Sequence, residues 1–194
     1  MSLDRRISKS KRALHDALLL LAEDQPLDKL SVTQIVQQAE LNRGTFYKHY
    51  DSKEQLLTEL IDHVLIELAD AFRSPYADLH PFSLKDLTPG HIKIFDHVYE
   101  HARFYSAVLN SKVIPGVQER IIDTLKHLAK DVVPSGQMAQ TDIVPHLFIS
   151  YYAHALFGLI KEWVRSDFCY SSSYMSRQLI QILRQQPVGE APQP

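Results

Sequence analysis

The sequence predicts an all-α fold of about nine helices, and three observations support this assignment. Apolar residues recur every three or four positions along successive segments, the spacing that places them on one face of a helix. Segment ends coincide with Pro, Ser, Asn or Asp, which favour helix boundaries. The chain shows no alternation typical of strands, no internal repeat and no low-complexity block. With 194 residues, 45% of them hydrophobic, it can bury a substantial core.

The first helix is predicted over residues 8–23. Leu14, Leu18 and Leu21 fall at helical spacing. Pro26 ends the helix, because a residue that precedes proline avoids the α region. The formal net charge of the whole chain is −2, yet its beginning is basic. This basic run, which we expect to contact an anion, consists of Arg5, Arg6, Lys9, Lys11 and Arg12.

Two short helices are predicted next, over residues 32–39 and 43–49. Ser31 can cap the first and Asn42 the second, since their side-chain oxygens accept hydrogen bonds from free amides at a helix start. Two short helices joined by a tight turn form a helix-turn-helix, which presents the beginning of its second helix to base edges in the major groove of DNA.

The second short helix carries more polar and basic side chains than packing requires. Arg43 can fork onto guanine or phosphate, and Gly44 permits close approach of the backbone. Phe46 and Tyr50 are expected to turn inward. The predicted DNA contacts are Thr33, Asn42, Arg43, Gly44, Thr45, Tyr47, Lys48, His49 and Lys53, together with Arg5 and Arg6. The alternative is a basic helical hairpin whose charged face is merely solvated.

The remaining helices are predicted from caps and apolar spacing. Ser52 and Gln55 form a capping box before a long helix whose apolar residues run from Leu56 to Phe72. A proline-rich loop follows at 73–90. Asp142 is predicted to cap a helix that holds Pro145 in its first turn. Further helices are predicted over 90–102, 103–110, 115–131, 142–166 and 172–185. The predicted domains are 1–52, 53–187 and a disordered tail, 188–194.

The helix over residues 142–166 is apolar nearly all round, which predicts burial on two sides. Its uncharged run, 143–160, reaches the length of a membrane span, but Pro145, His146 and Ser150 favour a helix buried in protein, so no membrane contact is expected. One side is expected to face a second subunit, in a bundle of four helices. The predicted dimer interface consists of Tyr152, Leu156, Gly158, Leu159, Trp163, Leu179, Ile182 and Leu183.

Histidines and aromatic residues gather in the second part of the chain and can line an apolar ligand cavity. The predicted pocket residues are His97, His101, Tyr105, Tyr151 and His154. His97 and His101 also match the H-x-x-E-H spacing of some zinc peptidases. No third ligand is evident, so we expect no metal site, no cofactor and no enzymatic activity. Cys169 is the only cysteine, which excludes an intrachain disulfide and fits a cytoplasmic protein.

The segment "SVTQIVQQAELNRGTFYKHYDSKEQLL", residues 31–57, resembles the DNA-binding segment of the tetracycline-repressor (TetR) family of bacterial regulators. The resemblance rests on Val32, Ile35, Ala39 and Leu41, on "GTFYKHY" and on "SKEQLL", and it covers about residues 8–60. The segments "FDHVYEHARFYSAVLN" and "LFGLIKEWVRSDFCYSSSYMSRQLIQIL" resemble one C-terminal subgroup of that family. This subgroup includes regulators of dihydroxyacetone use, some of which work with a protein co-regulator.

The resemblance implies a homodimer in which the first three helices bind DNA, the fourth links, and the last two pair across a two-fold axis. It implies a repressor released from a palindromic operator by a small-molecule effector. The alternatives are an activator or adaptor that works with a protein co-regulator, and a histidine-based metal-binding protein. The chain departs from the family at Glu40, where glycine is common. A left-handed backbone there would cost about 1 kcal/mol.

Overall fold

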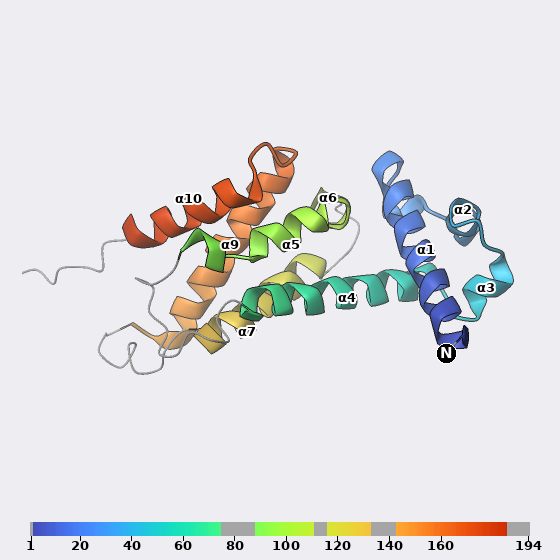
Figure 1. Cartoon of the computed structure of the whole chain (residues 1–194), viewed down its shortest axis with the longest axis horizontal. Helices are drawn as coiled ribbons and strands as arrows, with labels where there is room; N and C mark the ends of the chain where they lie inside the picture. Colours follow the sequence, from blue (N-terminus) through green and yellow to red (C-terminus); the bar gives the residue numbers. More distant parts are fainter. Residues whose placement is uncertain (1, 75–87, 111–115, 133–142, 186–194) are drawn as a thin grey trace, which may run out of the picture. The chain divides into compact units, whose positions relative to one another are not determined.

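The computed structural model confirms the all-α prediction for the residues it describes, which are 2–74, 88–110, 116–132 and 143–185. Within these ranges it has nine α-helices and no strand (Figure 1). The chain divides into two compact units. The first comprises Met1–Ile66 and His101–Ile121, and the second comprises Glu67–Glu100 and Ile122–Pro194. The predicted domain boundary at 52/53 falls at the start of a helix whose first part belongs to the first unit.

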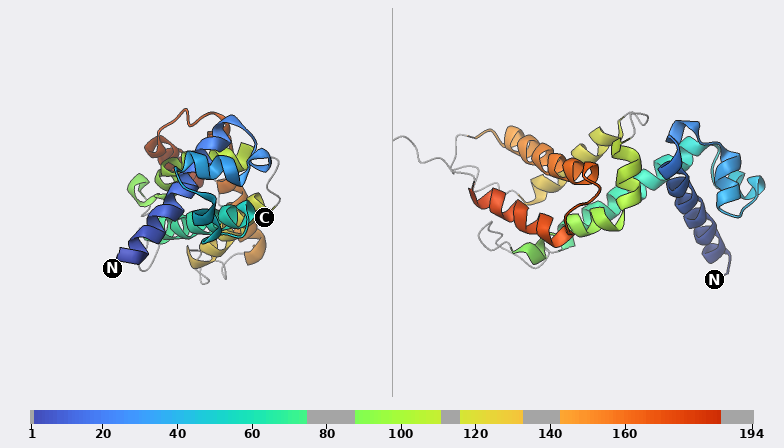
Figure 2. Two further views of the ribbon diagram at one scale, coloured as in Figure 1. Left: turned by 90° about the vertical axis from the view of Figure 1, so that its right-hand side faces the viewer. Right: turned by 90° about the horizontal axis from the view of Figure 1, so that it is seen from above.

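The first unit is built around α1, which packs against α2 and α6. Figure 2 shows α1 as the dark blue helix at the N-terminus. The elements of this unit are α1 (Ser2–Asp24), η1 (Leu27–Lys29), α2 (Val32–Gln38), α3 (Arg43–Tyr47), α6 (Ala102–Asn110) and the first parts of α4 (Lys53–Arg73) and α7 (Val117–Val132). Helix α1 begins six residues before the predicted position 8. Its core side chains include Leu14, Leu18, Ile35, Phe46, Leu56 and Leu60.

Capping bonds define the ends of the short helices. Ser31 Oγ accepts from the Gln34 backbone N–H at 3.3 Å, and Gln34 Oε1 accepts from the Ser31 backbone N–H at 2.9 Å, which completes a capping box. The box predicted at α4 is only half formed. Ser52 Oγ accepts from the Gln55 N–H at 3.3 Å, but Gln55 Oε1 accepts from the Asp51 N–H, one residue earlier than predicted.

The turn between α2 and α3 is closed by backbone bonds around Glu40. The Leu41 N–H donates to the Val36 carbonyl at 2.8 Å, and the Glu40 N–H donates to the Gln37 carbonyl at 3.1 Å. This pair of bonds is a Schellman motif, which requires a left-handed residue after the helix. Glu40 occupies that position with φ of 53°, so the strained conformation considered from the sequence is present.

The second unit contains the end of α4, η4 (Pro89–His91), α5 (Ile94–Glu100), the end of α7, α9 (Pro145–Arg165) and α10 (Ser172–Gln185). Helix α10 packs against α5 and η4. Ser172 Oγ donates to Asp96 Oδ1 at 2.6 Å, and Ser176 Oγ donates to the Ile92 carbonyl at 3.1 Å. These bonds connect the last helix to segments more than 70 residues earlier in the chain.

Several predicted boundaries require correction. The helix predicted over 90–102 is two elements, η4 and α5, separated by a break. Helix α9 begins with Pro145 in its first turn, as predicted, but its N-cap is Val144, which makes no side-chain capping bond. The predicted cap, Asp142, lies outside the described residues, as do 75–87 of the predicted loop and the tail 188–194. None of the helices in the described ranges combines the length and apolar character needed to cross a membrane.

Replacement of Glu40 tests the strain in the α2–α3 turn. A left-handed backbone costs a residue with a Cβ about 1–2 kcal/mol, and glycine avoids this cost. Glycine, however, lowers the free energy of unfolding by about 0.5–1 kcal/mol, because it loses more conformational entropy on folding. Glu40→Gly should therefore be about 0.5–1 kcal/mol more stable than Glu40→Ala, which keeps the Cβ. Urea denaturation of the two variants measures the difference. If Glu40→Gly were instead about 0.5–1 kcal/mol less stable than Glu40→Ala, the φ of Glu40 would carry no strain.

Candidate nucleic-acid interface

Helix α3 separates an inward from an outward face. Phe46 and Tyr50 are buried, as predicted, and their rings contact each other with centroids 5.6 Å apart. Arg43 and Tyr47 share the opposite face and are exposed, and Lys48 follows as the exposed C-cap. The helix has five residues, so each face is defined by a pair of side chains one turn apart. The outward face therefore presents a guanidinium, a phenol and an ammonium group to solvent.

Arg43 and Tyr47 form a pair on the outward face. The Arg43 guanidinium donates to Tyr47 Oη at 3.3 Å and lies 5.9 Å from the centre of its ring. The Tyr47 ring in turn meets Phe46 edge to face at 5.4 Å. This contact uses one of the five N–H donors of the guanidinium, which leaves donors for a base edge or a phosphate.

Asn42, Gly44 and Thr45 build the start of α3. Asn42 Oδ1 accepts from the Thr45 backbone N–H at 2.7 Å and from Thr45 Oγ1 at 3.1 Å. A Cβ added at Gly44 would lie 3.2 Å from the same Oδ1 atom, closer than an ordinary contact. These three predicted contact residues therefore have a structural role in the capping of α3, and Gly44 leaves room for the cap.

Two further predicted contacts border this surface. Thr33 lies in the first turn of α2 and is exposed. His49 is half-buried and its ring meets Tyr50 at 6.2 Å. The positions of Arg5 and Arg6 fall within α1, and their side chains lie outside the described residues.

Lys53 was predicted to contact a phosphate, but its ammonium group binds backbone carbonyls of its own unit. Its Nζ donates to the carbonyls of Asp28 and Leu30 at 2.7 Å each, with the Leu27 carbonyl at 3.4 Å. These carbonyls belong to η1 and the residue after it, so Lys53 ties the α1–α2 connection to the start of α4. We therefore replace the phosphate contact predicted for Lys53 by a structural role.

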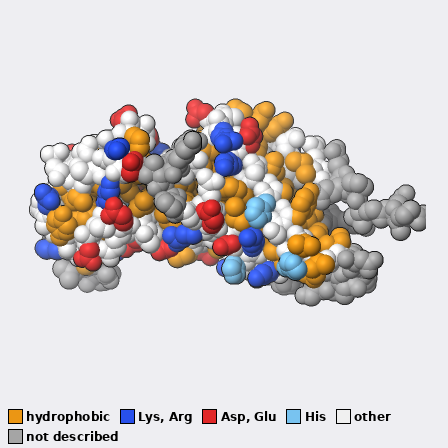
Figure 3. Space-filling view, turned by 180° about the vertical axis from the view of Figure 1, so that it is seen from behind, with side chains coloured by type: hydrophobic (Ala, Val, Ile, Leu, Met, Phe, Trp, Pro, Cys, Tyr) orange, Lys and Arg blue, Asp and Glu red, His pale blue; other side chains and the backbone are white. Residues whose placement is uncertain are grey.

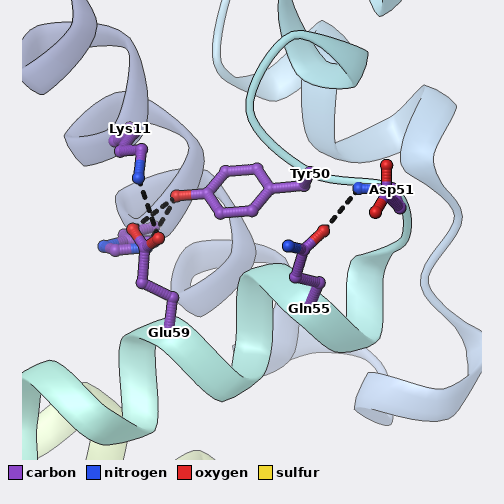
Figure 4. A network of polar contacts seen from close by, with 6 residues as sticks. Lys11, Tyr50, Asp51, Gln55 and Glu59 are labelled. Atoms are coloured by element: carbon purple, nitrogen blue, oxygen red, sulfur yellow. Dashed lines mark hydrogen bonds and ion pairs between the residues drawn. The ribbon is translucent and has the colours of Figure 1, made fainter.

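Glu59, on α4, was not among the residues predicted from the sequence, although it contacts Tyr50 at the end of α3. Its carboxylate accepts from Lys11 of α1 and from Tyr50, as Figure 4 shows. The three residues are separated in the chain by as many as 48 positions, so no local pattern connects them. Only the fold of the first unit brings them together.

The predicted pocket residues have different environments. In the second unit His97 is buried, whereas Tyr151 is 57% exposed. His154 is also exposed, with its Nδ1 2.7 Å from the Ser150 carbonyl of its own helix. In the first unit Tyr105 is fully buried, which raises the pKa of its hydroxyl, and His101 is half-buried. Tyr151 and His154 therefore do not line the interior that holds His97.

The part of the chain that the structure describes contains no group of three or more His, Cys, Asp or Glu side chains that could hold a metal ion, and this includes the surroundings of His97 and His101.

Trp163 was predicted at a dimer interface, but it is buried within its own unit. The indole is 2% exposed, contacts Phe95 and Phe168 edge to face, and donates from Nε1 to the Tyr170 carbonyl at 3.0 Å. It is enclosed by its own unit because the turn after α9 folds back over it. The other predicted interface residues are at least partly accessible: Tyr152, Leu156, Gly158, Leu159, Leu179, Ile182 and Leu183.

Helix α9 exposes apolar side chains in addition to those predicted. Leu147 is 58% exposed, and Tyr151 lies one turn further along the same face. A Cβ added at Gly158 would meet nothing within 4 Å. Patches of exposed hydrophobic side chains are also visible on the face shown in Figure 3. Leu147, Tyr151 and Gly158 are exposed on one face of α9, and we call this set the stripe on α9.

Comparison with known proteins places both parts of the chain among bacterial regulators. Residues 10–60 match the family model described as "Bacterial regulatory proteins, tetR family". Residues 85–185 match the model described as "Transcriptional regulator C-terminal region". Together the matches cover the helix-turn-helix, α5, α6, α7, α9 and α10.

Individual proteins show the same relationship. The uncharacterized HTH-type transcriptional regulator YxbF of Bacillus subtilis is 26% identical over an alignment 190 residues long, which covers 93% of this chain and 46% of YxbF. The chain thus spans about half the length of that relative. The Dihydroxyacetone kinase operon activator DhaS has a similar fold, with a TM-score of 0.64, 18% identity and coverage of 91% of this chain and 95% of DhaS. A TetR transcriptional regulator from Streptococcus agalactiae also has a similar fold, with a TM-score of 0.59 and 21% identity. The match covers 93% of this chain and 96% of that protein.

The structural role of Lys53 can be measured without DNA. Lys53→Met removes the ammonium group that binds the η1 carbonyls, and hydrogen bonds from charged groups contribute about 1.5–3 kcal/mol. We expect the free energy of unfolding to fall by about 1–2 kcal/mol in urea denaturation, since part of the carbonyl surface regains water. Lys48→Met is the matched control at an exposed lysine, where a change below about 0.5 kcal/mol is expected. Equal stability of the two variants would contradict the structural role.

Proposed function

Because the chain belongs to the tetR family of bacterial regulatory proteins, we propose that it represses transcription as a homodimer bound to a palindromic operator, from which a small-molecule effector releases it. The chain is a transcriptional regulator of the DNA-binding type. The observation that carries the proposal is the outward face of α3. A helix anchored by two buried rings offers Arg43, Tyr47 and Lys48 to a polyanion.

In the proposed complex α3 enters the major groove. Arg43 reads a base edge, because a guanidinium can bind O6 and N7 of guanine together. Tyr47 and Lys48 bind phosphate oxygens, and Thr33 does so at the start of α2, where backbone amides favour anions. Arg5 and Arg6 lie on α1, which begins at Ser2, so we propose that they follow the DNA backbone as part of a helix.

The proposed dimer covers the exposed stripe on α9. Leu147, Tyr151 and Gly158 lie on one face, and Ile182 of α10 is 41% exposed. Soluble proteins seldom leave such stripes uncovered. A second copy related by a two-fold axis would cover them in a four-helix bundle. The same symmetry suits two recognition helices in successive major grooves, roughly 34 Å apart.

The effector is proposed as a small molecule bound among apolar and aromatic residues of the C-terminal region. His97 is its proposed polar contact, since this imidazole on α5 is buried. The outward positions of Tyr151 and His154 suit the dimer surface better than a pocket.

A second function is favoured by one comparison. DhaS, which shares the fold, is an operon activator by name. As an activator, the chain would contact a co-regulator or RNA polymerase from a site upstream of the promoter. Footprinting on genomic DNA separates the two functions. An operator that overlaps the promoter supports repression, and one that lies upstream of it supports activation.

The DNA contacts predict two different mutant phenotypes. Arg43→Ala should cost about 1–3 kcal/mol in binding and relax the preference at one base pair, because a base contact is lost. Lys48→Ala should weaken binding to all sequences and reduce the slope of log K against log salt by about one, because a phosphate contact is lost. Fluorescence anisotropy on a duplex selected from random DNA, at several salt concentrations, measures both. Wild-type binding by both variants would refute the assignment of α3.

Gly158→Glu tests the dimer surface. The fold of one chain has space for a side chain at this position, so the variant should remain folded. In the proposed interface, however, two carboxylates would meet or be buried near the two-fold axis, which is strongly unfavourable. We expect a monomer by light scattering and a loss of operator binding, with Gly158→Ala as the control that adds a Cβ without charge. A dimeric Gly158→Glu variant with normal operator affinity would place the interface elsewhere.

A further inference from the structure

The carboxylate of Glu59 joins three elements of the first unit (Figure 4). Its Oε2 atom accepts from Lys11 Nζ of α1 at 2.8 Å. Its Oε1 atom accepts from the hydroxyl of Tyr50, which follows α3, also at 2.8 Å. The two oxygens therefore bind donors from different elements. Glu59 itself is on α4, so the position of this helix is coupled to α1 and to the end of α3.

Tyr50 links Glu59 rigidly to α3. The Tyr50 backbone N–H donates to the Phe46 carbonyl at 2.9 Å, and its buried ring packs against Phe46. The phenol therefore cannot shift without the last turn of α3. Burial, followed by the hydrogen bond to Glu59, raises the pKa of Tyr50, so its hydroxyl remains a donor at neutral pH.

The charges around Glu59 favour the same arrangement. Burial acts to raise the pKa of Glu59, but hydrogen bonds from Lys11 and Tyr50 outweigh it and lower the pKa. The carboxylate is therefore ionised at neutral pH. His15 of α1 faces the same pair, with Nε2 3.4 Å from the Tyr50 hydroxyl and 3.8 Å from Glu59 Oε1. Burial lowers the pKa of His15, so the imidazole adds no competing positive charge at neutral pH.

Stability alone does not account for this network. Partly exposed ion pairs contribute little to folding, and Glu59 and Lys11 both retain contact with solvent. The apolar side chains of α1, α3 and α4 already form the core of the unit. Apolar packing is non-directional, whereas hydrogen bonds prefer a narrow range of distance and angle. The network is thus suited to setting the orientation of α3.

We propose that Glu59 is a positioning residue for DNA binding, which fixes the orientation of α3 through Tyr50 and holds α1 to the same helix through Lys11. This inference rests on the proposed function, in which α3 enters the major groove. Glu59 does not itself contact DNA. Helix α4 continues to Arg73, so a displacement of α4 along its axis would strain both hydrogen bonds at once.

The test uses Glu59→Gln, Tyr50→Phe and the double variant in the full chain. The probe is a duplex that the wild-type protein selects from random DNA. Each single variant should bind it about 3- to 10-fold more weakly, the effect of one hydrogen bond. The effects of the two changes should be less than additive in the double variant, because both act on the bond between Tyr50 and Glu59: glutamine replaces its charged acceptor with a weaker neutral one, and phenylalanine removes its donor. The salt dependence of binding should not change, since no phosphate contact is lost.

Asp62→Asn is the matched control. Asp62 lies one turn further along α4 and pairs with Arg120 of α7, so the variant also breaks an ion pair without touching α3. It should bind the duplex like wild type. Hydrogen exchange of the amides at 45–50, measured where all variants are fully folded, should become faster in Glu59→Gln and stay unchanged in Asp62→Asn.

Two results would overturn the proposal. One is wild-type affinity for the duplex in Glu59→Gln. If Arg43→Ala still weakens binding in that case, the proposed function stands and only the role of Glu59 is refuted. The other is a loss of affinity that follows melting temperature alike in Glu59→Gln and Asp62→Asn, which would indicate global stability. If the wild-type protein selects no duplex at all, the proposed function fails first and this inference with it.

Discussion

The burial of Phe46 and Tyr50 beneath α3 is the interaction on which the DNA-binding unit depends. A helix of five residues is far too short to be stable in isolation. Its stability comes from these two rings and from the Asn42 cap, and both are contacts on one side or at one end. The outward face of α3 therefore does not need to pack against other elements. Arg43, Tyr47 and Lys48 can therefore remain exposed without loss of the fold.

The second unit meets a different constraint, because α9 is apolar on more than one side. Its own unit covers Phe157, Ile160 and Trp163. The turn after the helix closes over Trp163 through two successive residues with positive φ, Asp167 and Phe168, and the Phe168 N–H donates to the Trp163 carbonyl at 3.0 Å. The apolar stripe on α9 remains exposed among the residues that the structure describes. This division of α9 into a covered and an uncovered side is the physical basis of the proposed dimer.

Local signals in the sequence predicted much of this structure. Caps such as Ser31 and Asn42 act on residues two or three positions away, so their pattern can be read from the chain. The inward rings of α3 follow from helical spacing, and the left-handed Glu40 was recognised because the family often has glycine there. The helix-turn-helix and its outward residues were therefore predictable.

The errors involve contacts between distant residues. Lys53 binds carbonyls 23–26 positions earlier, and Glu59 binds Lys11 across 48 positions. Trp163 is covered by a turn whose direction depends on two non-glycine residues with positive φ, for which the sequence carries no marker. In each case the side-chain type suggested exposure or an interface, and the fold supplied an internal partner instead.

The central claim, that α3 binds in the major groove, is tested most directly by methylation interference on the selected duplex. Methylation of guanine N7 blocks the major groove, whereas methylation of adenine N3 blocks the minor groove. We expect that N7 methylation within two half-sites about one helical turn apart prevents binding of the wild-type protein. The Arg43→Ala variant should become insensitive to methylation at one guanine in each half-site. Interference by adenine N3 methylation alone would contradict it, because the protein would then read the DNA from the minor groove.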